Sequence, residues 1–360
     1  MLYPEWARDD SREGMRLRQA SVVEIDGSFG EGGGQIVRTA SSLAVVTATP
    51  CRIFNIRQGR REPGLRLQHL HGLRALAELC GGVFSGDEVG SRELAFSPGH
   101  AGVRELRVAI PTAGSITLVL QSLIPAALRF TEPVTVRFEG GGTDTAMSPT
   151  LDYLRHVLLW FVSRMGIAPQ IEVARRGYYP RGGAEILVRI IPSRLGAINA
   201  VERGALRRVS IVSSAAAVLR ARRVAERQIE GATEALGALP LAPDSAIDYS
   251  PSRSAGSAVC VVAEFENTVV GADGLGARGK RAEEVGREAA QAFLREFEST
   301  ACLDRHMADQ ILPYMALADG ESAVTVSEIT AHCRTNMWVI ERFMPGRFEV
   351  NGNLIRWRAA

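Results

Sequence analysis

The sequence predicts an α/β or α+β fold in which helices cover sheets. Three observations support this prediction. Strand-like and helix-like segments alternate, the alternation recurs without a strict repeat period, and the pattern of residues changes near residue 200. The 360 residues exceed what one core usually holds, so we expect two domains or one built of repeated units. We expect a tail over 1–20, a large catalytic domain made of 21–199 and 279–360, and a smaller domain inserted over 200–278.

The individual elements follow from apolar spacing and from cap and turn residues. We expect strands over 21–26, 51–57, 92–96, 105–110 and 134–142, with helices over 34–48, 67–82 and 148–166 and another that opens at Gly114-Ser115. In the helix over 148–166, Ser148 is the expected N-cap and Pro149 the first helical residue. Later segments predict a strand and a long basic helix over 205–236, strands over 256–279, a helix over 280–299 and a hairpin over 348–357.

Composition limits the function classes. The net charge is +2, so any polyanion must meet a local positive patch. Lys280 is the only lysine, which leaves a single candidate for a covalent lysine intermediate, in a loop-like stretch. The five cysteines show no CxxC and no paired spacing, which argues against zinc and disulfides and favours the reducing cytoplasm. No apolar run reaches membrane length, and the N-terminus lacks the apolar region of a signal peptide, so we expect no membrane partner.

A glycine-rich loop, "DGSFGEGGG" over 26–34, separates the first strand from the first helix. Its backbone N–H groups at a helix N-terminus suit a phosphate, but close packing against a neighbouring element explains glycines equally well. Glu31 would repel a phosphate unless a divalent ion lay between them, which would make Glu31 a metal ligand. The alternative interpretation is that Glu31 is a solvated turn residue.

Further polar residues leave similar choices open. The loop over 57–66 is rich in arginine, which suits phosphate or simply a solvated surface, and Gln68 and His69 begin a helix directly after it. Gln121 lies inside an apolar helix, where an amide serves either the core or a ligand. A histidine taken by itself is more often structural than catalytic, so the residue pattern alone selects no nucleophile.

Taken together, however, the motifs resemble one family. The chain is similar to the RNA 3′-terminal phosphate cyclases from about residue 21 to its end, through "DGSFGEGGGQIVRTA", "RQGRREPGLRLQHL", "GSITLVLQSLIPAAL", "GGTD", "GYYPRGG", "HMADQILPYMALA" and "HCRTN…VIERF" in that order. The resemblance implies a large domain of three repeated units, each a four-stranded sheet with two helices, and a smaller inserted α/β domain.

The resemblance also implies a reaction. ATP adenylylates an enzyme histidine, AMP passes to an RNA 3′-phosphate, and the neighbouring 2′-hydroxyl displaces AMP to close a 2′,3′-cyclic phosphate. The implied partners are ATP, Mg²⁺ or Mn²⁺, and RNA with a 3′-phosphate end, whereas the oligomeric state is not specified.

The family's functional residues transfer by motif. The nucleophile corresponds to His332, and Glu31 matches the residue beside the metal of the triphosphate. The remaining matches are ATP-binding positions, of which Pro149 lies against the adenine and the last six face the phosphates: Pro149, Gln121, His306, Met307, Ala308, Asp309, Gln310, Gln35, Arg38, Arg57, Arg60, Gln68 and His69. Some relatives carry at position 306 a tyrosine that stacks on adenine, and imidazole offers a smaller face.

Two other classes compete with this interpretation. A noncatalytic cyclase-like RNA-assembly factor would not need His332, which is intact. An enolpyruvyl transferase of related fold would need phosphate-binding lysines, and this chain has one lysine.

Overall fold

The computed structural model describes residues 22–100 and 102–360. The tail expected over 1–20 lies outside the described residues. Four sheets of four strands each, flanked by helices, build the described chain, so the predicted mixed α/β class is confirmed. No helix in these two ranges combines the length and the hydropathy that a membrane span requires.

Three of the sheets share one connectivity. In each, the first strand pairs in parallel with the second, the fourth lies antiparallel beside the second, and the third forms the far edge, giving the orders β1-β2-β4-β3, β5-β6-β8-β7 and β9-β14-β16-β15. Helices occupy the connections between the first and second and between the second and third strands. The three repeated units that the resemblance implies are thus present in the topology.

The first two units are continuous in sequence. The first consists of β1 (Val23–Asp26), α1 (Gly34–Thr47), β2 (Cys51–Phe54), α2 (Leu67–Cys80), β3 (Val83–Ser85) and β4 (Leu94–Ser97). The second consists of β5 (Glu105–Ser115), α3 (Ile116–Ala127), β6 (Val134–Gly142), the consecutive helical segments α4 (Leu151–Tyr153), η2 (Leu154–Leu158) and α5 (Leu159–Arg164), and then β7 (Gln170–Arg175) and β8 (Glu185–Ile190).

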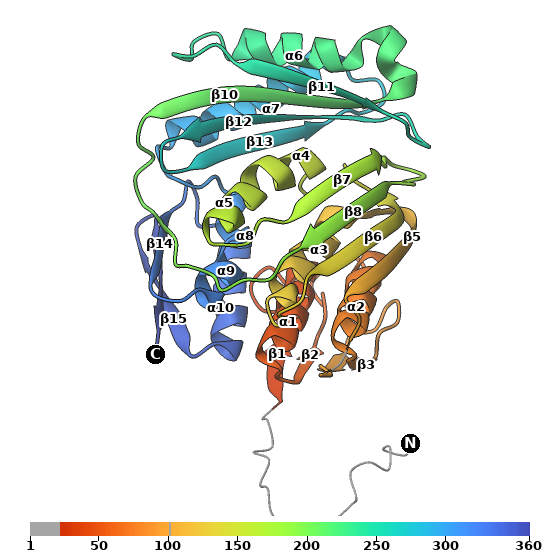
Figure 1. Cartoon of the computed structure of the whole chain (residues 1–360), viewed down its shortest axis with the longest axis vertical. Coiled ribbons are helices and arrows are strands. Elements are labelled where there is room, and N and C mark those ends of the chain that lie inside the picture. The colour runs from red at the N-terminus through yellow and green to blue at the C-terminus, as the bar shows by residue number, and fades with distance from the viewer. Residues whose placement is uncertain (1–21, 101) are drawn as a thin grey trace, which may run out of the picture.

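The third unit is interrupted after its first strand. It consists of β9 (Asn199–Ala200), α8 (Met307–Gln310), α9 (Leu312–Leu317), β14 (Ser322–Thr325), α10 (Ala331–Phe343), β15 (Gly346–Asn351) and β16 (Leu354–Ala359). The interruption holds a fourth sheet, ordered β11-β10-β12-β13, at one end of the molecule (Figure 1). Its elements are β10 (Leu206–Ala216), η3 (Ala217–Arg222), α6 (Val224–Ala235), β11 (Asp244–Ser250), β12 (Ser257–Phe265), β13 (Val269–Leu275) and α7 (Ala282–Glu298).

Local signals set several helix ends. Ser115 caps α3 by accepting a hydrogen bond from the Leu118 N–H, and Gly81 ends α2 in the left-handed conformation at φ 65°, as the sequence predicts. The helix expected to begin at Pro149 instead begins at Leu151. Thr150 is its N-cap and accepts from the Tyr153 N–H, because other contacts hold the two preceding residues in the loop.

Two hydrophobic cores lie behind this arrangement. One is continuous through the three repeated units, and the second lies within the inserted domain. The sequence places the helix after residue 279 with the large domain, but Val285, Ala289 and Phe293 of α7 belong to the second core. An apolar helix face shows that a helix is buried, not which sheet buries it, so packing extends the inserted domain to the end of α7.

Two glycines allow α6 and α7 to lie in close contact. A Cβ on Gly286 would lie 1.9 Å from the Gln228 carbonyl oxygen, and one on Gly231 would lie 2.0 Å from that of Glu283. Real side chains do not tolerate such distances, so any added methyl must push the helices apart.

We therefore expect Gly286→Ala to lower the free energy of unfolding by about 2 kcal/mol, although alanine normally favours a helix. Urea titration measures this loss. Gly237→Ala is the matched control, since its new Cβ would meet only the Glu234 carbonyl oxygen at 3.4 Å. Equal stability of the two variants would show that α7 does not pack against α6 in this way.

Candidate active site

Helices from opposite ends of the chain meet at the candidate site. Gln35, in the first turn of α1, donates a 2.9 Å hydrogen bond from its amide to the His332 carbonyl oxygen, although 297 residues separate them. Thr39, one turn further along α1, donates to the side chain of Asn336 on α10 at 2.9 Å. These bonds bring the glycine loop before α1 beside the first turn of α10, where His332 lies.

The glycine loop serves two purposes. Gly30 adopts φ 58°, and a Cβ there would lie 2.4 Å from Thr335 Oγ1 of α10, so close packing explains this glycine. The N-cap of α1, by contrast, is Gly33, which offers no side chain to the first N–H groups of the helix. These donors remain available to an anion at the N-terminus of a helix of 14 residues.

Glu31 is held between an arginine and a histidine and is no free turn residue. Its Oε1 lies 2.5 Å from Arg60 Nη2, and its Oε2 lies 2.5 Å from His332 Nε2. Burial acts to raise the pKa of Glu31, but hydrogen bonds and charge from Arg60 and His332 outweigh it and lower the pKa below the usual value. The carboxylate therefore links the glycine loop, the basic loop and the histidine.

A pocket opens beside this cluster, between α1, α3, the short helices α8 and α9, and α10. It brings together five of the residues selected from the sequence, namely Gln35, Arg38, Gln121, Asp309 and Gln310. Thr39 and Asn336, which the sequence reasoning did not select, also line it. A signal for Asn336 was present, because in "HCRTN" it follows His332 at i+4, on the same face of a helix.

Two opposite charges in this pocket perturb each other. Burial raises the pKa of Asp309 to about 6, against the opposing effect of His332 and Arg38. Burial also lowers the pKa of Arg38 to about 10, and Asp309 opposes that change. Asp309 Oδ2 lies 3.9 Å from His332 Nδ1, which exceeds hydrogen-bonding distance but makes it the second carboxylate facing this ring.

Two hydrogen-bonded glutamine side chains form another wall of the pocket. Gln121 donates from its amide to the Gln310 side chain at 2.8 Å, and Gln310 donates to the His306 carbonyl oxygen at 2.7 Å. The sequence left Gln121 between a core role and a ligand role. In the structure it lies on the pocket wall and bonds to a second residue of that wall.

The basic loop is partly occupied with its own structure. Arg57 donates to the carbonyl oxygens of Glu62 and Gly64, at 2.8 and 2.9 Å, and so closes the loop. Burial together with the neighbouring charges of Arg66 and Arg60 lowers the pKa of Arg57. A bound anion would relieve that repulsion. Gln68 is exposed at the start of α2 and lines a small cavity together with His69 and Arg38.

The remaining selected residues lie outside the pocket lining. Met307 and Ala308 are fully buried in the large core, and their N–H groups donate to the side chain and to the carbonyl oxygen of Asp304, respectively. His306 is exposed at the start of α8, and Pro149 precedes the cap of α4. Asp304, which the sequence reasoning missed, accepts hydrogen bonds from the N–H groups of His306 and Met307 at 3.0 and 2.9 Å. The only local feature of the sequence that could have indicated this role of Asp304 is its position two residues before His306.

The donor set for a divalent ion is small. Among the described ranges, no group of three or more His, Cys, Asp or Glu side chains could hold a metal ion by itself. Glu31 offers one hard carboxylate beside the free N–H groups of α1, and Mg²⁺ commonly takes one or two carboxylates together with substrate phosphates. The residues present therefore fit an ion shared with a bound polyphosphate.

His69 is a buried base of this site that stays neutral. Its Nδ1 accepts a 2.9 Å hydrogen bond from the Arg66 N–H, and its side chain is enclosed against Gly34, where a Cβ would lie 2.2 Å from Nε2. Burial, and then repulsion from Arg38, Arg57 and Arg66, lowers the pKa of His69 from 6.5 to about 3. An unfolded chain binds a proton near pH 6.5 that the folded state refuses, so stability falls as the pH drops below 6.5.

We expect His69→Gln to flatten this part of the pH dependence. Between pH 6.5 and pH 5 the His69 contribution lost by the wild type is about 2 kcal/mol, at about 1.4 kcal/mol per pH unit. Urea unfolding of both proteins at the two pH values measures the difference, because the other titrating groups are common to both. Parallel pH profiles would contradict the buried, neutral assignment of His69.

The comparisons with known proteins agree on one family. A family model described as RNA 3′-terminal phosphate cyclase matches residues 29–350. The RNA 3′-terminal phosphate cyclase of Thermococcus kodakarensis is 46% identical over 334 residues, which cover 92% of this chain and 95% of that protein. The one of Methanopyrus kandleri is 43% identical over 340 residues, 92% of this chain and 96% of that protein.

The similarity to a solved structure is much weaker than the similarity to these relatives. The enolpyruvyl transferase NikO from Streptomyces tendae gives a TM-score of 0.28 at 11% identity, over 94% of this chain and 82% of that one, which is too low to bear on function. The family match spans most of the chain, with similar lengths on both sides. This chain belongs to the RNA 3′-terminal phosphate cyclase family.

Proposed function

We propose that this protein converts an RNA 3′-terminal phosphate to a 2′,3′-cyclic phosphate, with ATP as the activating substrate and His332 as the nucleophile. The names of its relatives support the overall reaction. The observation that carries the choice of nucleophile is the place of His332, in the first turn of α10, between two carboxylates and beside the pocket lined by Arg38 and Gln121.

The reaction needs a group that accepts AMP and then releases it. A ring nitrogen of His332 bonds to the α-phosphorus of ATP, and the bond from that phosphorus to the pyrophosphate oxygen breaks. An oxygen of the RNA 3′-phosphate then displaces the histidine, which leaves AMP joined to the RNA end. Finally the 2′-oxygen attacks the 3′-phosphorus, loses its proton and expels AMP. Dividing the transfer in this way replaces one difficult step by easier ones.

The surroundings of His332 suit the first step. Nε2 is the nitrogen that faces the glycine loop, and Glu31 engages it in the free protein at 2.5 Å. Attack through Nε2 requires its lone pair, so nucleotide binding has to draw Glu31 away. Nδ1 then carries the ring hydrogen, and Asp309 is the carboxylate that faces it, at 3.9 Å in the free protein. A carboxylate in this position stabilises the ring as positive charge develops on it.

The phosphate chain would be held by backbone and guanidinium groups. Arg60 and His332 Nε2 each engage one oxygen of Glu31, and the uncapped N–H groups at the start of α1 follow Glu31 in the chain. A divalent ion held by Glu31 and the phosphates would supply positive charge where the leaving pyrophosphate gains negative charge. Arg60 is released for the phosphates when Glu31 changes partner.

The two competing classes are less well supported by the site. An enolpyruvyl transferase would need lysines near the ligand, and the one lysine, Lys280, forms an ion pair with Glu288 in the inserted domain. A noncatalytic assembly factor would not require the two carboxylates, Glu31 and Asp309, that face His332. In the basic segment of the inserted domain, two of the four arginines, Arg223 and Arg227, pair with Glu230 and Glu283.

Incubation with α-labelled ATP and Mg²⁺ or Mn²⁺ should leave an acid-labile label on the wild-type protein, because a phosphorus–nitrogen bond is lost in acid. We expect His332→Asn to abolish the label, with His100→Asn, which removes an exposed histidine elsewhere, as the matched control. An unlabelled wild type would favour the noncatalytic alternative. Label that persists in His332→Asn would refute this nucleophile.

Glu31→Ala should reduce this labelling by about tenfold or more, because the charge on the departing pyrophosphate would lose its counterion site. Initial rates over a Mg²⁺ or Mn²⁺ titration measure the effect. Glu93→Ala is the control, since it removes an exposed carboxylate that pairs with Arg52 on another face. A metal dependence that is the same in Glu31→Ala as in the wild type would remove Glu31 from the metal role.

A further inference from the structure

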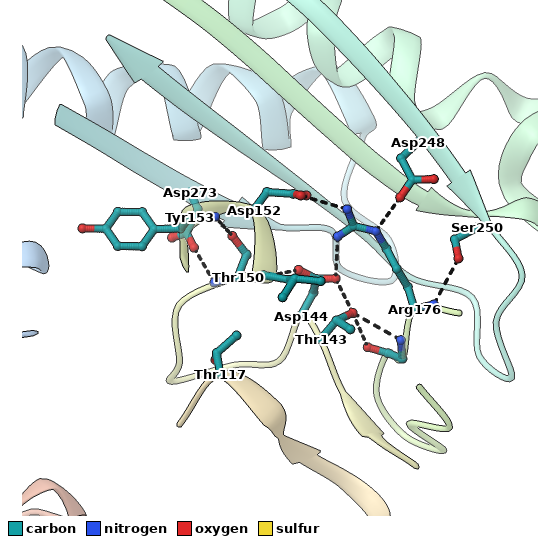
Figure 2. A network of polar contacts seen from close by, with 12 residues as sticks. Thr117, Thr143, Asp144, Thr150, Asp152, Tyr153, Arg176, Asp248, Ser250 and Asp273 are labelled. Carbon is teal, nitrogen blue, oxygen red and sulfur yellow. Dashed lines mark hydrogen bonds and ion pairs between the residues drawn. The ribbon is translucent and has the colours of Figure 1, made fainter. Parts of the chain in front are cut away.

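The loop between β6 and α4 is fixed by hydrogen bonds at three successive residues. The Pro149 carbonyl oxygen accepts a 2.8 Å bond from Thr117 Oγ1 of α3. The next residue, Thr150, donates its N–H to Asp273 Oδ2 at 2.7 Å (Figure 2). Leu151 donates its N–H to Asp144 Oδ1 at 3.1 Å. Of these three contacts, the middle one comes from the inserted domain, because Asp273 lies on β13.

The third contact also depends on the inserted domain, through one arginine. Arg176, which is 2% exposed and follows β7, forms ion pairs with Asp144 at 3.3 Å, Asp152 at 2.8 Å and Asp248 at 2.7 Å (Figure 2). Asp248 lies on β11 of the inserted domain. A buried guanidinium with three carboxylate partners has no other place to go, so it fixes the orientation of Asp144.

Strand β13, which carries Asp273, also reaches the turn that carries His306. Gly271 of β13 donates its N–H to Asp304 Oδ2 at 3.2 Å. The other oxygen of Asp304 accepts from the Tyr153 hydroxyl at 2.6 Å and from the His306 and Met307 N–H groups at 3.0 and 2.9 Å. Burial raises the pKa of the Asp273 carboxyl, and hydrogen bonds from Thr150 and the nearby His306 only partly oppose this rise.

Two residues of β13 therefore support two turns that carry residues selected from the sequence. Gly271 supports the turn that carries His306, and two residues later Asp273 supports the turn that carries Pro149. The resemblance to the cyclase family matches Pro149 and His306 to the adenine side of ATP, so under the proposed function these two turns meet the base of the bound nucleotide. The repeated units supply the catalytic histidine and the phosphate side, whereas the base side is tied to a strand that is inserted between them.

We propose that β13 of the inserted domain sets the spacing of the base-binding end of the ATP site, and that Asp273 is its positioning residue, acting through the Thr150 N–H on Pro149. This inference rests on the proposed ATP-dependent function. The inserted domain then contributes to nucleotide affinity without touching the phosphates or His332. A loop that is already fixed by hydrogen bonds spares the protein the cost of ordering it on binding.

The test compares a ligand that has a base with one that lacks it. In the full-length protein, the dissociation constant of ATP and the inhibition constant of inorganic tripolyphosphate against adenylylation are measured for the wild type, Asp273→Ala, Asp273→Asn and Asp244→Ala. Asp244→Ala is the matched control, because it removes an exposed β11 carboxylate whose partner is Arg208. Asp273→Asn keeps an oxygen that can accept from Thr150.

We expect Asp273→Ala to weaken ATP about tenfold, the size of effect that follows loss of a charge-assisted hydrogen bond, and to leave tripolyphosphate unchanged. Asp273→Asn should recover most of the ATP affinity. If Asp273→Ala does not fold, Thr117→Val, which removes the hydroxyl bonded to Pro149, should show the same split between ATP and tripolyphosphate.

Unchanged ATP affinity in Asp273→Ala, or an equal loss for both ligands, would overturn the inference and leave the proposed function standing. A wild-type protein that neither binds ATP nor takes up label would instead refute the proposed function, and the inference with it. The two failures are therefore distinguishable in the same set of measurements.

Discussion

The packing of α1 against α10 is the contact on which the site depends. Gln35 and Thr39 of α1 bond to the backbone of His332 and to the side chain of Asn336, and Gly30 packs directly against Thr335. This packing joins the first and third repeated units at the N-terminal ends of both helices. One end supplies uncapped backbone donors and the other supplies His332, so the proposed nucleophile and the proposed anion site meet where neither unit alone has both.

The charges at this junction are arranged for exchange of partners. Glu31 satisfies Arg60 and His332 at once in the free protein, and Asp309 faces the same imidazole from the other side. A triphosphate would compete with these carboxylates for Arg60 and His332. The contacts at this junction are therefore ones that the proposed substrate could replace. The proposed base side differs, because its contacts through Asp144, Asp273 and Asp304 stay within the protein.

Local signals in the sequence predicted many of the helices and strands, but fewer of the contacts between them. Strand–helix alternation, the Ser115 cap and the terminal Gly81 gave correct elements, because each is decided within a few residues. The strand β11 was missed, since much of its side-chain surface is exposed and it lies at a sheet edge. Motif matching collected Gln35, Arg38, Gln121, Asp309 and Gln310, which do line one pocket. Asp273 and Asp304 escaped notice, because single carboxylates acquire their partners only in the folded chain.

The central claim is that AMP becomes bonded to the imidazole of His332. Tandem mass spectrometry of peptides from protein incubated with ATP and a divalent ion, digested under alkaline conditions that preserve phosphorus–nitrogen bonds, tests it most directly. The account predicts an adenylyl group on the peptide that spans "AHCRTN", with fragment ions that place it on the histidine. An adenylyl group on Lys280, or on any residue outside this turn of α10, would contradict it.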